Sequence, residues 1–331
     1  MAKPEKQDLT LTDHLTLKSL GNDSFETTHP PGKMANFPPV AYGGYALATA
    51  CKSAYLTVPT GYHLYSLQGN FLGPATTDRP LGANVRTVRQ TRAFATRQVE
   101  VTQKRDDGVD RVCLIAIADF QVKEQASLLE YSRPPRMTYS HYENLLARKE
   151  AHQKHMEDGK ITQKLFDAHE NAFGGMRFFE QRQCPEAVFA QNLWGMAKYL
   201  PTTQDHLPTT SKTSAEWFRC LEPMATPIDN MTSMTWFADG AISILPLAFN
   251  HLWLEDISAC SSLDFSLRFF KSGDEIDTCK WHLRELTTPV ASEARSFGES
   301  WLFDEQGSPV AYMSQQSILR PRPKPSGRGK L

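Results

Sequence analysis

Hydrophobic and polar positions along the 331-residue chain form two similar blocks, separated by a longer charged stretch. In the first block, residues 41–51 contain no charged side chain and include the pair Gly43-Gly44. This pattern predicts a buried helix that is entered through a tight turn. Runs rich in β-branched residues and in polar–apolar alternation follow, at 62–71, 82–88, 93–102 and 111–120. The turn signals between these runs predict a meander of strands.

The second block repeats this order of elements. The apolar stretch 239–252 predicts a second helix, with Pro246 as a kink or an end. Strand-like runs follow at 262–270, 278–286, 294–303 and 310–319. Two copies of a helix followed by strands constitute an internal repeat. They predict an α+β fold in which helices and strands are segregated along the chain.

Between the blocks, residues 139–173 are charged and contain few apolar positions, which predicts one or two surface helices. His152 and His155 lie in this stretch, and we interpret them as part of a solvated helix face, not as metal ligands. The proline-rich, basic tail is expected to be disordered. We therefore expect an N-terminal unit, a connecting segment with surface helices, a C-terminal unit and a tail, at 1–130, 131–214, 215–320 and 321–331.

Composition excludes several classes of function. The 36 Lys and Arg residues nearly balance the 37 Asp and Glu residues, so the basic excess typical of a nucleic-acid binder is missing. No apolar run is long enough to span a membrane, and the first residues lack the apolar segment of a secretory signal. The six cysteines are scattered without a C-x-x-C pair, which predicts reduced and mostly buried thiols. These features favour a protein inside the cell.

The sequence lacks G-x-S-x-G, H-E-x-x-H, Walker A and G-x-G-x-x-G motifs. Instead, LYSLQGNFLGP at 64–74 and VRTVRQTRAFATRQV at 85–99 resemble the acyl-CoA thioesterase II (TesB-like) family. Shorter segments at 262–264 and 310–320 are similar to it too, and the resemblance covers about residues 35–125 and 215–320. It implies a double hot-dog, that is, two tandem hot-dog folds in which an antiparallel sheet wraps around a central helix. It also implies a thioester hydrolase that converts acyl-CoA and water to a free acid and CoA, as in lipid metabolism.

The resemblance further implies a catalytic triad in the C-terminal unit: an Asp at the start of the helix, a Ser or Thr before a Leu-Asp pair, and a Gln on the last strand. Matched by motif, these are Asp239, Ser262 and Gln315, with Ser262 where Thr is commoner. Such a triad would activate a water without a metal or another cofactor, beside donors at a helix N-terminus. From the residues alone, Asp239 is also interpretable as a helix N-cap and Gln315 as an outward-facing strand residue. Gly43 and Gly44 form either a substrate-binding site or a plain tight turn.

Other functions stay open at this point. The substrate could be a carrier-bound or pathway-specific acyl thioester, or the chain could be a silent acyl-binding protein. A hydratase of this fold would need a His beside Asp239, and His251 lies too far along the chain. The resemblance implies a possible homodimer. Gly329-Lys330-Leu331 resembles the C-terminal address read by the peroxisomal import receptor, so we expect a peroxisomal location, with the cytoplasm as the alternative.

Overall fold

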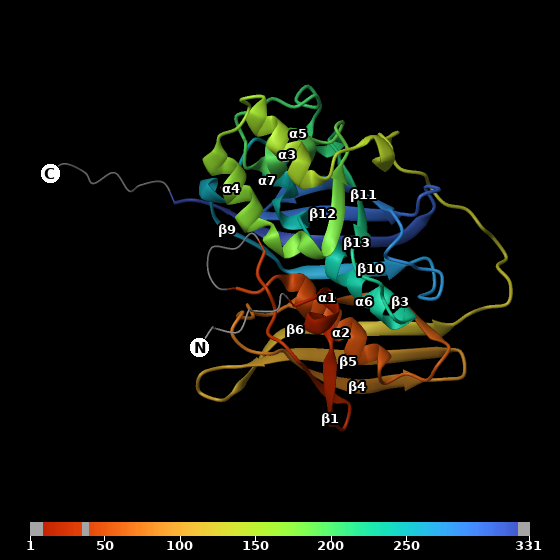
Figure 1. Cartoon of the computed structure of the whole chain (residues 1–331). Coiled ribbons are helices and arrows are strands. Elements are labelled where there is room, and N and C mark those ends of the chain that lie inside the picture. Colours follow the sequence, from red (N-terminus) through yellow and green to blue (C-terminus); the bar gives the residue numbers. More distant parts are fainter. Residues whose placement is uncertain (1–8, 35–39, 324–331) are drawn as a thin grey trace, which may run out of the picture.

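In the part of the chain that the structure describes, 13 strands form one antiparallel sheet, which is the body of the protein (Figure 1). The computed structural model describes residues 9–34 and 40–323. Twelve strands follow the order β1-β2-β4-β5-β6-β3-β10-β13-β12-β11-β8-β7, and β9 pairs with β13 beside this path. The strands are β1 (Leu17–Gly21), β2 (Ser24–Thr27), β3 (Tyr62–Phe71), β4 (Gly82–Gln90), β5 (Phe94–Lys104), β6 (Asp110–Val122), β7 (Phe179–Gln183), β8 (Ser214–Cys220), β9 (Ile257–Ser262), β10 (Asp264–Phe269), β11 (His282–Ser292), β12 (Arg295–Phe303) and β13 (Pro309–Pro321).

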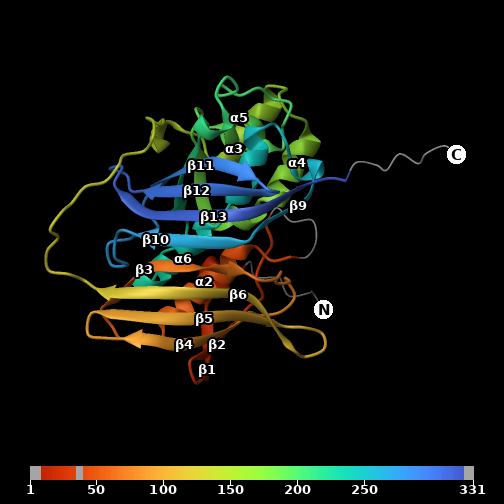
Figure 2. The same cartoon turned by 180° about the vertical axis from the view of Figure 1, so that it is seen from behind.

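Two helices, α2 (Gly43–Tyr55) and α6 (Pro227–Ala238), lie side by side on one face of this sheet. Figure 2 shows the opposite side, with the strands in front of both helices. The helices are antiparallel. Lys52 near the end of α2 bonds Asp229 at the start of α6 at 2.9 Å, while Tyr42 just before α2 donates to the Trp236 carbonyl near the end of α6 at 2.7 Å. The N-terminus of α2 therefore lies beside the C-terminus of α6.

Each block of the sequence supplies the main strands of one half of the sheet, and the halves are extended at their outer edges by β1 and β2 on one side and by β8 and β7 on the other. Strands β3 and β10 join them through a register that runs from Asp264 opposite Asn70 to Arg268 opposite Ser66. Each half places its own helix over its own strands, which confirms the predicted α+β double hot-dog. The strand-like runs of both blocks are confirmed as β3 to β6 and β10 to β13, with shifted ends.

The predicted helix at 239–252 is wrong. The central helix of the second half is α6, which ends at Ala238, and residues 239–252 form a 3₁₀ turn and the short α7 (Leu245–Phe249). Helix α6 begins at the N-cap Thr226, whose hydroxyl accepts from the Asp229 N–H at 3.1 Å, and Pro227 takes the first helical position. Its Thr, Ser and Trp residues are weak helix formers, so burial stabilises α6 more than propensity does.

Three further helices, α3 (Arg148–Glu157), α4 (Gln163–Ala172) and α5 (Val188–Asn192), lie over the second half of the sheet, and the short α1 (Leu11–Leu15) lies near α2 (Figure 1). The interpretation of His152 as a solvated residue is wrong, because its side chain is fully buried under α4. In the described part of the chain, no helix is long and apolar enough to cross a membrane. The predicted tail lies almost wholly outside the described residues.

Candidate active site

A cavity of about 630 Å³ lies between the two halves of the molecule. Ligand pockets of proteins commonly have volumes of about 300–1,000 Å³. Its wall is mainly apolar and comes from both halves, with Phe71, Ala75 and Leu81 from the first and Ile244, Leu254 and Cys260 from the second. Asp239 is the only carboxylate that the described residues contribute to this wall. An elongated apolar group with one reactive polar end would match this lining.

Asp239 is the C-cap residue directly after α6, and it is only 8% exposed. The expectation that it begins a helix is therefore wrong. A helix N-terminus does lie next to it, but this is the N-terminus of α2, from the other half of the chain. The backbone N–H of Gly44 donates a hydrogen bond to the Asp239 carboxylate. Partial positive charge at the start of α2 therefore faces this carboxylate.

Ser262, Gln315 and Asp239 are joined in this order by hydrogen bonds. The Nε2 of Gln315 donates to Oδ1 of Asp239 at 2.5 Å, and the Ser262 hydroxyl donates to Oε1 of Gln315 at 3.3 Å. Gln315 is fully buried on β13, whereas its neighbour Gln316 is exposed and bonds Asp264. The structure thus excludes an outward-facing Gln315 and brings together the three residues that the resemblance implied. Their catalytic roles stay a prediction.

Burial dominates the electrostatics of Asp239. Loss of hydration raises the pKa of this carboxyl from 3.8 to about 6, against the opposing effects of the Gln315 and Gly44 hydrogen bonds. The phenol of Tyr42 lies nearby, and burial together with the Asp239 charge raises the pKa of Tyr42 well above its usual value. Tyr42 therefore stays neutral near Asp239. The carboxylate can exchange a proton close to neutral pH, which is where a general base works best.

Gly43 and Gly44 occupy the first two positions of α2, each for a different steric reason. A Cβ at Gly43 would lie 2.8 Å from Oδ2 of Asp239 and 3.0 Å from the Phe71 ring. A Cβ at Gly44 would overlap the Tyr42 ring and would lie 2.5 Å from the Trp236 carbonyl oxygen. Gly43 thus leaves room for the carboxylate in the cavity, and Gly44 allows α2 and α6 to approach closely. Of these two glycines, Gly43 lines the cavity and Gly44 does not.

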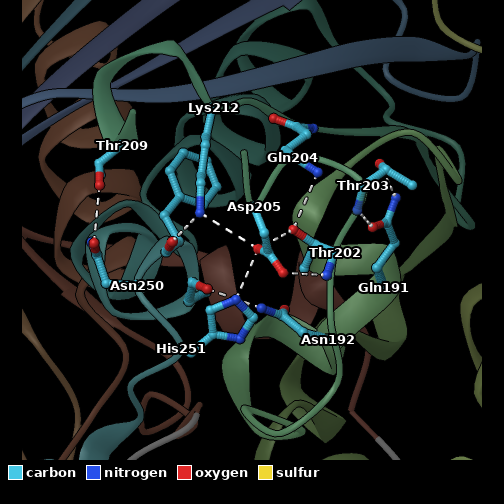
Figure 3. A network of polar contacts seen from close by, with 12 residues as sticks. Gln191, Asn192, Thr202, Thr203, Gln204, Asp205, Thr209, Lys212, Asn250 and His251 are labelled. Atoms are coloured by element: carbon cyan, nitrogen blue, oxygen red, sulfur yellow. Dashed lines mark hydrogen bonds and ion pairs between the residues drawn. The ribbon is translucent and has the colours of Figure 1, made fainter. Parts of the chain in front are cut away.

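His251 bonds residues outside this site. Its Nε2 lies 2.8 Å from the Asp205 carboxylate, and its Nδ1 lies 2.9 Å from the Lys198 carbonyl oxygen (Figure 3). Asp205 also faces the Lys212 ammonium group at 3.6 Å and accepts from Thr202. This hydrogen-bonded network holds the segment before β8 against the end of α7. The His–Asp pair that a hot-dog hydratase would need is therefore not formed between His251 and Asp239.

One group of metal-ligating side chains occurs among the described residues: His152, His169 and Glu170. It joins α3 to α4 and contributes nothing to the cavity wall. The Nδ1 of His169 lies 3.3 Å from the Glu170 carboxylate, and the Nε2 of His152 lies 3.1 Å from Oε1 of Gln183. Arg148 lies 4.0 Å from the same carboxylate and already balances its charge. These contacts join the two helices, and the Nδ1 of His152 and the Nε2 of His169 are buried without a hydrogen-bond partner from the described residues.

The sequence matches two family models in tandem. The acyl-CoA thioesterase N-terminal domain matches residues 30–121, and the acyl-CoA thioesterase C-terminal domain matches residues 162–319. The chain belongs to the acyl-CoA thioesterase family. It is similar to acyl-CoA thioesterase 2 of Haemophilus influenzae, with 23% identity over 285 residues that cover 84% of this chain and 87% of the relative. It is thus a homologue of known thioester hydrolases.

Solved structures of acyl-CoA thioesterases share this fold. An acyl-CoA thioesterase II from Mycobacterium marinum superposes with a TM-score of 0.66 at 20% identity and covers 96% of this chain and 99% of its own. A hot-dog protein of unknown function from Alicyclobacillus acidocaldarius gives a TM-score of 0.66 at 15% identity, with 94% and 98% covered. At these identities the superpositions show the double hot-dog architecture alone.

Two features of the site were missed in the sequence. The start signal of α6 is present as Thr226-Pro227 followed by Asp229, but the later apolar run 239–252 matched a helix better by composition. The contact of Gly44 with Asp239 joins two segments almost 200 residues apart, and no local pattern reports such a contact. The paired symmetry of the two blocks was the one signal that could have placed their helices side by side.

Proposed function

We propose that this protein hydrolyses an acyl-CoA to a free acid and CoA, with Asp239, Gln315 and Ser262 activating the attacking water. The observation that carries this proposal is the position of Asp239. Its carboxylate lies in the wall of an apolar cavity, bonds Gln315 and the start of α2, and has a pKa of about 6. Membership of the acyl-CoA thioesterase family supports the choice of substrate.

The chemistry needs no covalent intermediate. The Ser262 hydroxyl proton is donated to Gln315, so its lone pairs are free to accept one proton of a water, and the Asp239 carboxylate accepts the other. The water oxygen then attacks the thioester carbonyl carbon while Asp239 takes the proton. When the carbon–sulfur bond breaks, Asp239 returns this proton to the thiolate and is ready for another turnover. The N-terminus of α2 favours negative charge that develops on the carbonyl oxygen.

Thiol release from a panel of acyl-CoAs, followed with a chromogenic thiol reagent, tests this proposal. We expect hydrolysis of at least one acyl-CoA by the wild-type enzyme and its loss in Asp239→Asn. The same acyl groups presented on an acyl carrier protein discriminate the second candidate, a thioesterase of a biosynthetic pathway. Faster release from the carrier would favour that candidate. Acyl binding without thiol release from either donor would contradict hydrolysis and favour a silent acyl-binding protein.

We also propose import into peroxisomes through Gly329-Lys330-Leu331, which lies outside the described residues. A small residue, a basic residue and Leu at the C-terminus match the address that the import receptor reads. A fluorescent protein fused to the N-terminus should give puncta in a host with peroxisomes, and deletion of the three residues should make the signal diffuse. A diffuse signal with the intact tail would favour the cytoplasm and leave the thioesterase proposal untouched.

A further inference from the structure

A buried ion pair lies directly beneath the end of α6. Arg284 on β11 and Glu216 on β8 face each other across neighbouring strands and are joined through Nη2 and Oε1. The Arg284 side chain has no exposed surface, and Glu216 is only 3% exposed. Gln181 on β7 donates to the second carboxylate oxygen of Glu216 at 3.0 Å, which fixes that carboxylate. Two charges are costly to bury, so this arrangement needs a reason beyond filling the core.

The other end of the Arg284 guanidinium binds the backbone on both sides of Asp239. Its Nη1 donates to the Gly240 carbonyl oxygen at 2.9 Å and to the Phe237 carbonyl oxygen at 3.4 Å. The guanidinium carbon also lies 4.4 Å from the centre of the Phe237 ring. Carbonyl groups at a helix C-terminus lack partners within the helix and carry partial negative charge. The Phe237 carbonyl oxygen also accepts from the Gly240 N–H at 3.1 Å, and Arg284 adds its own hydrogen bonds and the opposite charge at this point.

The backbone that Arg284 holds is strained two residues after Asp239. Ala241 has a φ of 71°, in the left-handed region that an alanine rarely occupies. Such a conformation persists only when its surroundings enforce it, and Arg284 fixes the carbonyl of the preceding Gly240. Ala241 also lines the cavity. Arg284 thus acts on the one turn that sets both the direction of the Asp239 side chain and part of the pocket wall.

We infer that Arg284, held by Glu216, is a positioning residue for Asp239, through its hydrogen bonds to the carbonyl groups of Phe237 and Gly240. Arg284 acts through the backbone and lies outside the cavity wall. This inference rests on the proposed function for its effect on rate, but its effect on the Asp239 carboxyl can be measured without turnover. Among the described residues, the start of α2 and the neutral Tyr42 face that carboxyl, whereas Arg284 bonds the backbone on both sides of Asp239 and not the carboxylate itself.

The first experiment compares Arg284→Met with Arg219→Met. Arg219 lies in the same sheet, on β8, and forms an ion pair with Glu180 at 2.6 Å, but its side chain is 40% exposed. We expect Arg284→Met to lower kcat about tenfold to a hundredfold at an almost unchanged KM, because a misplaced base weakens the chemical step more than binding. Arg219→Met should leave kcat unchanged. An unchanged kcat in folded Arg284→Met would overturn the inference.

A double variant separates positioning from stability. Arg284→Met alone leaves Glu216 buried without a partner and should lower the melting temperature. Glu216→Met in addition removes that unpaired charge, so Arg284→Met/Glu216→Met should regain most of the melting temperature. The Gly240 carbonyl still lacks its Arg284 donor and the Phe237 carbonyl keeps only its backbone donors, so kcat should stay low. Recovery of both the melting temperature and kcat in the double variant would show that the ion pair is purely structural.

An activity-independent measurement follows the ionisation of Asp239 itself. The amide N–H of Gly44 bonds this carboxylate, so its NMR signal in ¹⁵N-labelled protein should titrate with it. We expect the midpoint to lie near pH 6 in wild type and higher in the double variant, because a displaced Asp239 loses part of the hydrogen bonding from Gln315 and Gly44 that favours its ionised form. An identical midpoint in both proteins would contradict the inference. A shifted midpoint in an enzyme that hydrolyses no thioester would retain it and reject the proposed function instead.

Discussion

The backbone N–H of Gly44 donates a hydrogen bond to the carboxylate of Asp239, so the start of α2 in the first half meets the end of α6 in the second. Each half alone supplies an incomplete site. The second half holds the carboxylate, Gln315 and Ser262, and the first half contributes the helix N-terminus and one wall of the cavity. Because the two helices are antiparallel, the positive end of one lies beside the negative end of the other. The tandem arrangement therefore creates an electrostatic environment that neither half has by itself.

Asp239→Asn should reduce kcat at least about a hundredfold, the usual scale for lost acid–base assistance. The amide keeps the size of the side chain and can still accept from Gly44 or Gln315, but it cannot take a proton from water. Steady-state thiol release at pH 7.5 measures the effect. Arg219→Met serves as the control for a substitution in the same sheet. Near wild-type turnover by Asp239→Asn would show that another group activates the water.

The rate should depend on pH through the same carboxyl. Its pKa of about 6 predicts that kcat/KM rises with pH up to about 6 and then levels off, because the ionised form is the base. Tyr42 stays neutral in this range, since its pKa is raised well above its usual value. A pH–rate profile between pH 4.5 and 8.5 on a stable acyl-CoA tests this. A flat profile in that range would be incompatible with Asp239 as the proton acceptor.

The stability of the fold should respond to pH in the opposite direction to the rate, and should fall as the pH rises. Burial raises the pKa of Asp239 from 3.8 to about 6, so the folded state binds this proton more tightly than the unfolded state. The carboxyl therefore destabilises the fold above pH 6 by about 3 kcal/mol, and this cost disappears as the pH falls toward 4. Asp239→Asn should melt higher than wild type at pH 8, with a difference that shrinks toward pH 4. A difference independent of pH would contradict the raised pKa.

The two glycines at the start of α2 should respond differently to alanine. In Gly43→Ala the new methyl group would meet Oδ2 of Asp239 and the Phe71 ring, both side-chain groups that can shift, so we expect a folded enzyme with reduced kcat. In Gly44→Ala it would meet the Trp236 carbonyl oxygen, part of the backbone of α6, and we expect a loss of at least about 2 kcal/mol of stability. Chemical denaturation and thiol release measure both. Equal stability losses would mean that the helices separate as easily as the side chains move.

Much of this fold could be predicted from the sequence because its strands are regular and its blocks repeat. Strand β3 begins and ends where the alternation of residues 62–71 begins and ends, and α2 lies in the uncharged stretch of the first block. Helix α6 could not be placed in this way, since every residue from Met231 to Ala238 is buried and the sequence shows no polar face. A helix that is buried all round loses the periodic signal on which such predictions rest.

Only part of the candidate site could be predicted, because some of its contacts join elements that lie far apart in the sequence. Asp239, Ser262 and Gln315 could be named because the resemblance matched motifs around each, and the structure places them in one hydrogen-bonded line. Arg284 could not be named, because an alternating strand of mixed polarity does not reveal which charged side chain faces a buried helix end. The burial of His152 was missed for the same reason, since a charged helix was assumed to be solvated. Contacts between elements distant in the sequence decide both cases.

Chelation of metal ions should leave hydrolysis unchanged. The cavity wall contributes Asp239, Cys113 and Cys260 as possible ligands, and among the described residues these do not form a group of three close ligand atoms. Dialysis against EDTA, followed by thiol release with and without added zinc or manganese, measures the effect. The melting temperature should be recorded too. The His152–His169–Glu170 group lies elsewhere in the fold, so an ion removed from it would change stability and not hydrolysis. Activity that is lost on chelation and restored by a metal ion would reject metal-free catalysis.

The last prediction concerns the order of donors in the line from Ser262 to Asp239. Because the Ser262 hydroxyl donates to Oε1 of Gln315, the amide is oriented with Nε2 toward Asp239. Ser262→Ala removes that donor and a water ligand, and kcat should fall about tenfold to a hundredfold, while Ser262→Thr keeps the hydroxyl and should retain most of the activity. Gln315→Glu should be the most damaging of the three, since a second carboxylate beside Asp239 would raise the pKa of one of the two. Its residual activity should therefore have a pH optimum shifted upward, which a pH–rate profile would detect. If Ser262→Ala and Ser262→Thr lose activity equally, the hydroxyl does not orient Gln315, and packing at this position of β9 is what matters.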